Sequence, residues 1–216
     1  MSEFSKEYFM QQLSWRYAVK KFDAGKKIST SDWEFLEEVL RLSPSSFGLQ
    51  PWKFLIVQNP EMRKKLTTAT WGQKQVEDCS HFVVLTTLKK IDVSFIDKYL
   101  KSIADTRGVP IGSLEAFKKN IVNTWVTGPR QSDVLSWTQR QVYIAMGNLM
   151  NAAAMLKIDT TPMEGLEPAK YDEILNLNST DFSTVAAVAC GYRSGDDELA
   201  RAKKVRFSKS EVFQII

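Results

Sequence analysis

Two cationic groups of residues lie close to opposite ends of this 216-residue chain. The first, "WRYAVKKFD" (15–23), carries Arg16 at the point where a helical pattern gives way to an extended one. The second, "KKVRF" (203–207), spaces Lys204 and Arg206 two residues apart, so an extended segment would point both side chains the same way. Converging cations of this kind suit a small anionic ligand.

Two further segments combine small, hydroxyl-bearing and turn-forming residues. "SPSSFGLQPWKF" (43–54) lies between a helical pattern and an apolar, strand-like run, and "TPMEGLEP" (161–168) is bounded by proline and glycine. The first is shaped to let a flat ligand lie against its backbone, and the second has N–H groups to expose. Taken singly, each group has an ordinary explanation: solvated cations, a helix stop, a turn and an exposed tail.

The elements that must position these groups alternate irregularly between helix and strand. Helices are predicted at 6–15, from about 31 to 42 with Ser31 and Glu34 at capping-box spacing, from Pro60 onward, over 132–156 and near 168–177. Buried strands are predicted at 53–58, 82–87 and 183–192. Since the strands are not separated by regular single helices, the pattern favours an α+β sandwich over a doubly wound sheet.

Composition limits the function classes. The net charge is +4 and the lysine pairs are scattered, so the concentrated basic element of a nucleic-acid-binding protein is absent. The longest purely apolar run, 185–190, is too short to span a membrane, and residues 1–7 hold no apolar signal core. Cys79 and Cys190 have no paired spacing. These features predict one cytoplasmic domain over 1–216.

The sequence lacks the motifs of several common kinds of enzyme and cofactor site. No G-x-G-x-x-G, phosphate loop or G-x-S-x-G elbow occurs in the sequence, and one histidine with two isolated cysteines argues against a metal site. His81, at the start of a predicted strand, is interpreted as a capping or partly buried residue rather than a catalytic one.

Together and in this order, the motifs resemble the nitroreductase family of flavin enzymes. The specific matches are R-x-x-x-K-x-F-D, S-P-S-S-x-x-x-Q-P-W, P-x-E-G and a late K-x-R, and they extend from Arg16 to Arg206. "SHFVVL" and "QVYIAMGNLMNAA" also match a strand and the central helix of that family. The resemblance implies a mixed, mostly antiparallel sheet flanked by helices, a long central helix, an extended C-terminal tail and a homodimer.

The resemblance also implies a site for flavin mononucleotide (FMN). Arg16, Lys204 and Arg206 would hold its phosphate, and Lys20 would approach the N1–O2 side of its ring. Pro44, Ser45 and Ser46 would reach the ring from the second subunit. Other implied contacts are Tyr17, Ala18, Gly72, Gln73, Met163, Glu164 and Gly165, the last three near the redox-active edge.

The implied activity is a ping-pong transfer of electrons from NADH or NADPH to a nitroaromatic, quinone or similar flat acceptor. The chemistry belongs to the flavin, so Lys20 and Glu164 are supporting residues and no side-chain proton donor is named. The alternatives are enone or pteridine reduction or reductive dehalogenation on the same scaffold, a non-enzymatic flavin-binding protein, and a basic interaction module without a cofactor.

Three features bear on substrates and assembly. Gly48 and Gly72 stand where the family often has asparagine, which affects the acceptor range more than flavin binding; Gln73 or Gln75 is expected to replace the amide. A helical excursion over 92–130 is predicted near the substrate channel, with Trp125 or Phe117 as covers, although core packing is the commoner role of such aromatics. The apolar tail 207–216 should pack on its own core or on another subunit.

Overall fold

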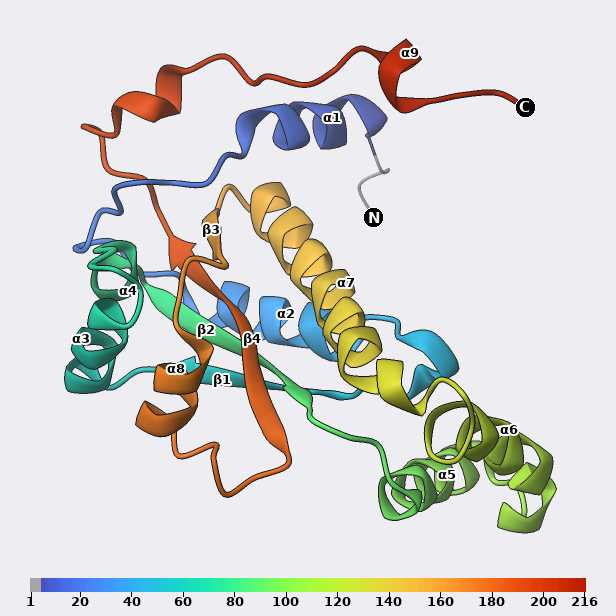
Figure 1. Cartoon of the computed structure of the whole chain (residues 1–216). Coiled ribbons are helices and arrows are strands. Elements are labelled where there is room, and N and C mark those ends of the chain that lie inside the picture. Colours follow the sequence, from blue (N-terminus) through green and yellow to red (C-terminus); the bar gives the residue numbers. More distant parts are fainter. Residues whose placement is uncertain (1–4) are drawn as a thin grey trace.

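The computed structural model of the chain describes residues 5–216, so part of the N-terminal stretch examined for a signal core lies outside the described residues. Its centre is a four-stranded sheet in the order β1-β2-β4-β3 (Figure 1). The strands are β1 (Trp52–Val57), β2 (His81–Leu88), β3 (Asp159–Met163) and β4 (Phe182–Gly191), and all three pairings are antiparallel. Ala18 adds a single parallel bridge to Thr160 of β3.

Helices cover both faces of the sheet. The α-helices are α1 (Lys6–Trp15), α2 (Thr30–Arg41), α3 (Pro60–Thr68), α4 (Gln75–Asp78), α5 (Val93–Arg107), α6 (Glu115–Trp125), α7 (Val134–Met155), α8 (Pro168–Ile174) and α9 (Lys209–Val212). Short 3-10 helices are η1 (Ser46–Gly48), η2 (Ile111–Leu114), η3 (Gln131–Asp133) and η4 (Glu198–Arg201).

The alternation of side chains along β2 divides the core into two layers. Val83 and Leu85 pack with α2 and the long helix α7, whereas Phe82 and Val84 point to the opposite face and pack with α3, α4 and α8 (Figure 1). All four side chains are fully buried. A third cluster joins α5 and α6 to the start of α7. The expected α+β sandwich is confirmed.

Most expected elements are present, with two differences. Helix α2 begins at Thr30, and Ser29, rather than Ser31, is its N-cap, because the Ser29 hydroxyl accepts from the Asp32 N–H. The second difference is β3, which the sequence reading treated as part of a turn. The 92–130 excursion is a helical pair, α5 and α6, interrupted at 108–114.

The C-terminal segment leaves the body of the molecule after η4 and runs past α1 (Figure 1). Every residue from 201 to 216 is exposed, including Phe213 at 71% and Ile215 at 100%. The tail therefore does not pack on its own core, which was one of the two expected arrangements.

Candidate functional site

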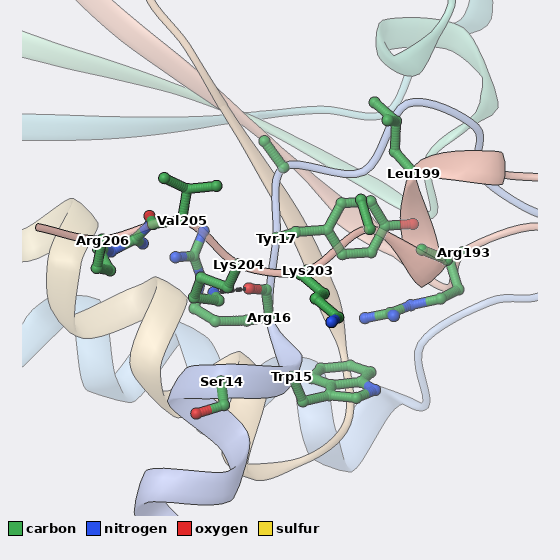
Figure 2. Close-up of a pocket in the computed structure, with 13 residues that line it drawn as sticks. Ser14, Trp15, Arg16, Tyr17, Arg193, Leu199, Lys203, Lys204, Val205 and Arg206 are labelled. Atoms are coloured by element: carbon green, nitrogen blue, oxygen red, sulfur yellow. Dashed lines mark hydrogen bonds between the residues drawn. The ribbon is translucent and has the colours of Figure 1, made fainter.

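The end of α1, the extended residues after it and the C-terminal segment together line a cavity of about 530 Å³ (Figure 2). Its cationic side chains are Arg16, Arg193, Lys203, Lys204 and Arg206, and the other lining residues are Ser14, Trp15, Tyr17, Ala18, Leu199, Ala200, Ala202 and Val205. None of these lining residues is acidic. The two cationic groups from opposite ends of the chain therefore share one cavity.

Arg16, Lys204 and Arg206 influence one another within this cavity. Burial lowers the pKa of Arg16, and the neighbouring charge of Arg206 lowers it further. Burial also lowers the pKa of Lys204, with added repulsion from Arg16 and Arg206. The Arg16 Nε is buried and has no hydrogen-bond partner among the described residues. Positive charge without a counter-charge, together with an unused buried donor, suits an anion.

Lys204 ties the C-terminal segment to the end of α1. Its ammonium group donates a hydrogen bond to the Arg16 carbonyl oxygen, a contact that joins residues 188 positions apart. Arg206 donates to the carbonyl of its own neighbour, Val205. The Lys204 contact fixes the C-terminal segment where both of its cations reach the cavity.

Sequence reasoning missed Arg193, which lies at the other end of the cavity in Figure 2. Its guanidinium stacks on Trp15 and Tyr17, with its carbon 4.1 and 4.6 Å from the ring centroids. It also pairs with the buried carboxylate of Asp159, Nη2 to Oδ1 at 2.5 Å. Arg193 is thus already neutralised and builds the wall of the cavity.

The extended residues after α1 run parallel to β3. Ala18 bridges Thr160, and the Thr161 hydroxyl donates to the Val19 carbonyl at 2.6 Å. At Lys20 the backbone leaves this pairing for the C-terminal segment, because the Lys20 and Lys21 N–H groups donate to Asp197. The side chain of Lys20 is exposed there.

The turn after β3 packs against the loop that follows α3. Gln73 donates from Nε2 to the Gly165 carbonyl at 3.0 Å. A Cβ built on Gly165 would lie 2.9 Å from Cζ3 of the Trp71 indole, so a larger residue at this position would have to displace that exposed side chain. Gly72, with φ of +76°, follows Trp71 at φ of +55°. Gln73 and Gly165 are therefore in contact, and Gly72, Met163 and Glu164 lie within two residues of them in the sequence.

Glu164 has a partner that the sequence did not reveal. The hydroxyl of Tyr143, on α7, donates to Glu164 Oε1 at 2.5 Å. Burial and the Glu164 carboxylate raise the pKa of Tyr143 to about 12. Met163 is buried in the core cluster beneath the turn, whereas Glu164 is exposed. The turn thus presents its carboxylate and backbone, rather than Met163, to solvent.

The turn at 43–50 lies elsewhere, beside α5 and the first half of α7 (Figure 1). Gln141 of α7 accepts from the Ser46 N–H at 2.9 Å, and the Ser45 hydroxyl accepts from the Gln50 N–H at 2.8 Å. Pro44 and Ser46 are exposed. Within the described chain, no residue of this turn lines the cavity around Arg16. A single subunit therefore does not bring the turn at 43–50 to the cationic cavity around Arg16.

Other singled-out residues have structural roles. His81 stacks on Trp33 with the ring centroids 4.0 Å apart, and its Nδ1 hydrogen-bonds with the Ser80 hydroxyl. Trp125 is buried against Trp137 in the α5–α6 core rather than covering a channel, whereas Phe117 is half-buried near Phe47. Gln75 is buried at the start of α4.

Residues 5–216 hold no group of histidine, cysteine and carboxylate side chains that could bind a metal ion. Cys79 and Cys190 are both buried and unpaired. None of the described helices is long and apolar enough to cross a membrane.

Comparison with known proteins gives consistent results. Residues 13–192 match the family model described as the nitroreductase family. "Putative NAD(P)H nitroreductase YfkO" of Bacillus subtilis is 38% identical over 206 residues, which cover 88% of this chain and 91% of that protein. A Staphylococcus haemolyticus protein with the same description is 34% identical over 217 residues, covering 97% and 98% of the two chains.

Solved structures share the fold. A protein described as a "putative nitroreductase" from Exiguobacterium sibiricum, crystallised in complex with FMN, superposes with a TM-score of 0.83 at 20% identity, and the match covers 100% of this chain and 99% of that protein. The Bacillus subtilis protein ydfN gives the same TM-score and identity, over 98% and 100% of the two chains.

Proposed function

Because this chain belongs to the nitroreductase family, we propose that it binds FMN and transfers electrons from NAD(P)H to flat organic acceptors. The observation that carries the proposal is the cavity at the end of α1. It is lined by five cations and no carboxylate, and the buried Nε of Arg16 has no partner in the described chain.

The phosphate of FMN fits the end of the cavity formed by Arg16, Lys204 and Arg206. A phosphate monoester carries nearly two negative charges and accepts hydrogen bonds on three oxygens, which matches these converging donors. Each charge-assisted hydrogen bond in a sheltered position contributes about 1.5–3 kcal/mol. Binding would also relieve the repulsion that lowers the pKa of Arg16 and Lys204.

The flavin ring would extend from there along residues 16–20 toward the turn at Glu164 and Gly165. Lys20 lies two residues after the Ala18–Thr160 bridge with an exposed side chain, and in this proposal it would approach the N1–O2 side of the ring. A unit positive charge 4 Å from the N1–O2 side contributes about 4 kcal/mol at an effective dielectric constant of 20. Lys20 therefore stabilises the reduced ring, and Gly72 and Gln73 border its pyrimidine end.

A second subunit supplies Pro44, Ser45 and Ser46 in this proposal. These residues are fixed to α7 by Gln141 and do not reach the cavity of their own subunit. The exposed apolar tail, with Phe207 at 80% and Phe213 at 71%, supports the same homodimer because its burial needs a partner surface.

The chemistry that FMN supplies is acceptance of hydride from NADH or NADPH and its later delivery to a nitroaromatic, quinone or similar acceptor, in a ping-pong cycle. The chain would hold the phosphate with Arg16, Lys204 and Arg206, and Lys20 and Glu164 would support the ring. The exposed Trp71, 70% accessible at the rim of this turn, offers a surface on which a flat acceptor stacks.

Absorbance spectroscopy of the purified protein tests the proposal. We expect yellow protein with flavin bands that bleach on anaerobic addition of NADH or NADPH. Colourless protein that does not bind added FMN would contradict the proposal and favour an interaction module, and yellow protein that neither nucleotide reduces would favour a flavin carrier.

The Arg206→Ala variant tests the phosphate site separately. We expect it to lower FMN retention at least severalfold, because it removes one of three converging donors. Arg201→Ala is the matched control, since Arg201 is exposed on the same segment and does not line the cavity. Equal FMN retention in both variants would remove Arg206 from the site.

A further inference from the structure

We propose that Asp197 is a positioning residue that fastens Lys20 and the C-terminal cations into one FMN site. The inference rests on the proposed function, because its consequence is measured on bound FMN. Asp197 does not line the cavity, and no motif in the sequence marks it.

The Asp197 carboxylate accepts hydrogen bonds from three backbone N–H groups, and the neighbouring Tyr17 hydroxyl also helps to lower its pKa. Its Oδ2 accepts from the Lys20 N–H at 2.7 Å and from the Lys21 N–H at 3.0 Å, while its Oδ1 accepts from the Leu199 N–H at 3.1 Å. The side chain is buried, with 4% of the residue exposed. A buried carboxylate is tolerated only with such partners, so these contacts hold both segments in register.

A second hydrogen bond joins the same two segments. The Ser194 N–H donates to the Lys21 carbonyl at 2.8 Å, so Lys21 is held through both its N–H and its carbonyl, and Lys20 through its N–H. Burial opposes ionisation of Asp197, but the N–H groups of Lys21 and Lys20 outweigh it and lower the pKa of the carboxyl. Asp197 is therefore charged when it makes these contacts at neutral pH.

The position of Asp197 along the chain makes it the last anchor before the cationic tail. It is the last buried residue of the sequence, because Ala200 is half-buried and the remainder of 198–216 is exposed. Through Leu199 it starts η4, which leads to Lys204 and Arg206. The Asp197 carboxylate thus fixes where the segment with Lys204 and Arg206 begins. It also fixes the backbone of Lys20, which in the proposed function approaches the flavin ring.

Neighbouring Asp196 supplies a matched control. Its side chain is 69% exposed, and it pairs with the Lys21 ammonium at 3.0 Å instead of with backbone donors. Asp196→Asn removes one negative charge, as Asp197→Asn does, but it leaves the backbone contacts of Asp197 intact.

The experiment compares Asp197→Asn with Asp196→Asn in the full-length protein. FMN affinity is measured by quenching of flavin fluorescence, and the midpoint potential of bound FMN by anaerobic dye titration. We expect Asp197→Asn to raise the Kd for FMN at least tenfold and to lower the midpoint potential, and Asp196→Asn to change the Kd less than twofold. In a Lys20→Met background, Asp197→Asn should no longer shift the potential, because its effect on the ring acts through Lys20.

Amide hydrogen exchange in the apoprotein separates this inference from the proposed function. Faster exchange at Lys20 and Lys21 in Asp197→Asn than in Asp196→Asn supports the anchor even if the wild-type protein binds no FMN. If Asp197→Asn does not fold, Asp197→Glu replaces it, with the same expected loss of FMN affinity at an unchanged melting temperature. A Kd within twofold of wild type in a folded Asp197 variant, or unchanged exchange, would overturn the proposal.

Discussion

At the scale of single residues, the cavity is distinguished by two cations, Arg16 and Lys204, that have no acidic partner among the described residues. Arg193 is paired with Asp159, but the described chain offers no carboxylate to Arg16 or Lys204. Cations in a folded protein repel one another when they converge, and here burial, with the repulsion added to it, lowers the pKa of both residues. This arrangement is unfavourable by itself and becomes favourable when an anion binds.

His81 provides a pH prediction at this scale. Burial, with the nearby charges of Arg63 and Lys27, lowers its pKa from 6.5 to about 4. The unfolded chain therefore binds a proton more readily, so the free energy of unfolding that His81 contributes is fully present above pH 6.5 and is lost as the pH falls toward 4. We expect this loss to be about 1–2 kcal/mol after allowance for solvent screening of a half-buried ring.

Because the sequence contains one histidine, its ring protons give an unambiguous NMR titration. We expect a midpoint near pH 4 and no titration between pH 6 and pH 7. Denaturant unfolding of wild type and His81→Gln at pH 7 and pH 4.5 measures the linked stability, and a midpoint near 6.5 would refute the prediction.

Candidate site residues could be predicted from the sequence where a short local motif marks them. Arg16, Lys204 and Arg206 carry recognisable spacing, and each lies on a short extended segment. Arg193, Asp159 and Asp197 could not be found this way, because their contacts join residues 34 and 177 positions apart. Such pairings arise from how strands and loops pack, which no window of sequence contains.

At the scale of elements, the turn at 43–50 depends on left-handed backbone geometry. Phe47, Gly48 and Gln50 have φ of +57°, +70° and +48°. A Cβ on Gly48 would also lie 2.2 Å from the hydroxyl of Tyr99, which donates to the Phe47 carbonyl. Steric contact with Tyr99 of α5 therefore explains why this chain has glycine at position 48, where the sequence comparison with the nitroreductase family leads one to expect asparagine.

The Gly48→Ala variant tests this explanation. Gly108→Ala is its control, since Gly108 has a similar φ of +65° and open space around it. Both variants incur the cost of a left-handed alanine, but Gly48→Ala should lose about 1–3 kcal/mol more because of overpacking. Tyr99→Phe should remove part of that excess in a double-mutant cycle measured by denaturant unfolding. Equal losses in both alanine variants would exclude a role for Tyr99.

Element prediction failed chiefly at β3. This strand is five residues long and contains Pro162, which lacks the N–H of a central strand. It is tolerated because β3 is at the edge of the sheet and pairs only with β4 among the named strands. The edge position depends on the tertiary arrangement and could not be predicted from the sequence. The buried strands β1, β2 and β4 could be predicted, because they are short runs of apolar and β-branched residues.

At the scale of the whole molecule, the proposed site is divided between two surfaces. One subunit offers the cavity and the turn at Glu164, but no residue of the turn at 43–50 lines that cavity. The exposed tail carries apolar side chains at Phe213 and Ile215. Each side chain of this size contributes about 1.5–3 kcal/mol when it is buried, so the tail is well suited to hold a partner subunit.

Deleting residues 207–216 tests this assembly while keeping Lys204 and Arg206. We expect the wild-type protein to be a dimer by sedimentation equilibrium, and the deletion to weaken the dimer at least tenfold. FMN retention should fall with it, because dissociation removes Pro44, Ser45 and Ser46 from the ring. The loss should be smaller at high protein concentration, where the dimer re-forms.

Two variants test whether the dimer depends on burial of the apolar side chains of the tail or only on the presence of the tail. The double variant Phe213→Ser and Ile215→Ser should reproduce most of the effect of the deletion, whereas Gln214→Ser between them should leave the dimer and FMN retention unchanged. The physical reason is that only the apolar side chains gain free energy by leaving water. A stable, flavin-loaded monomer in any of these variants would show that one subunit completes the site alone, and the turn at 43–50 would then need another role.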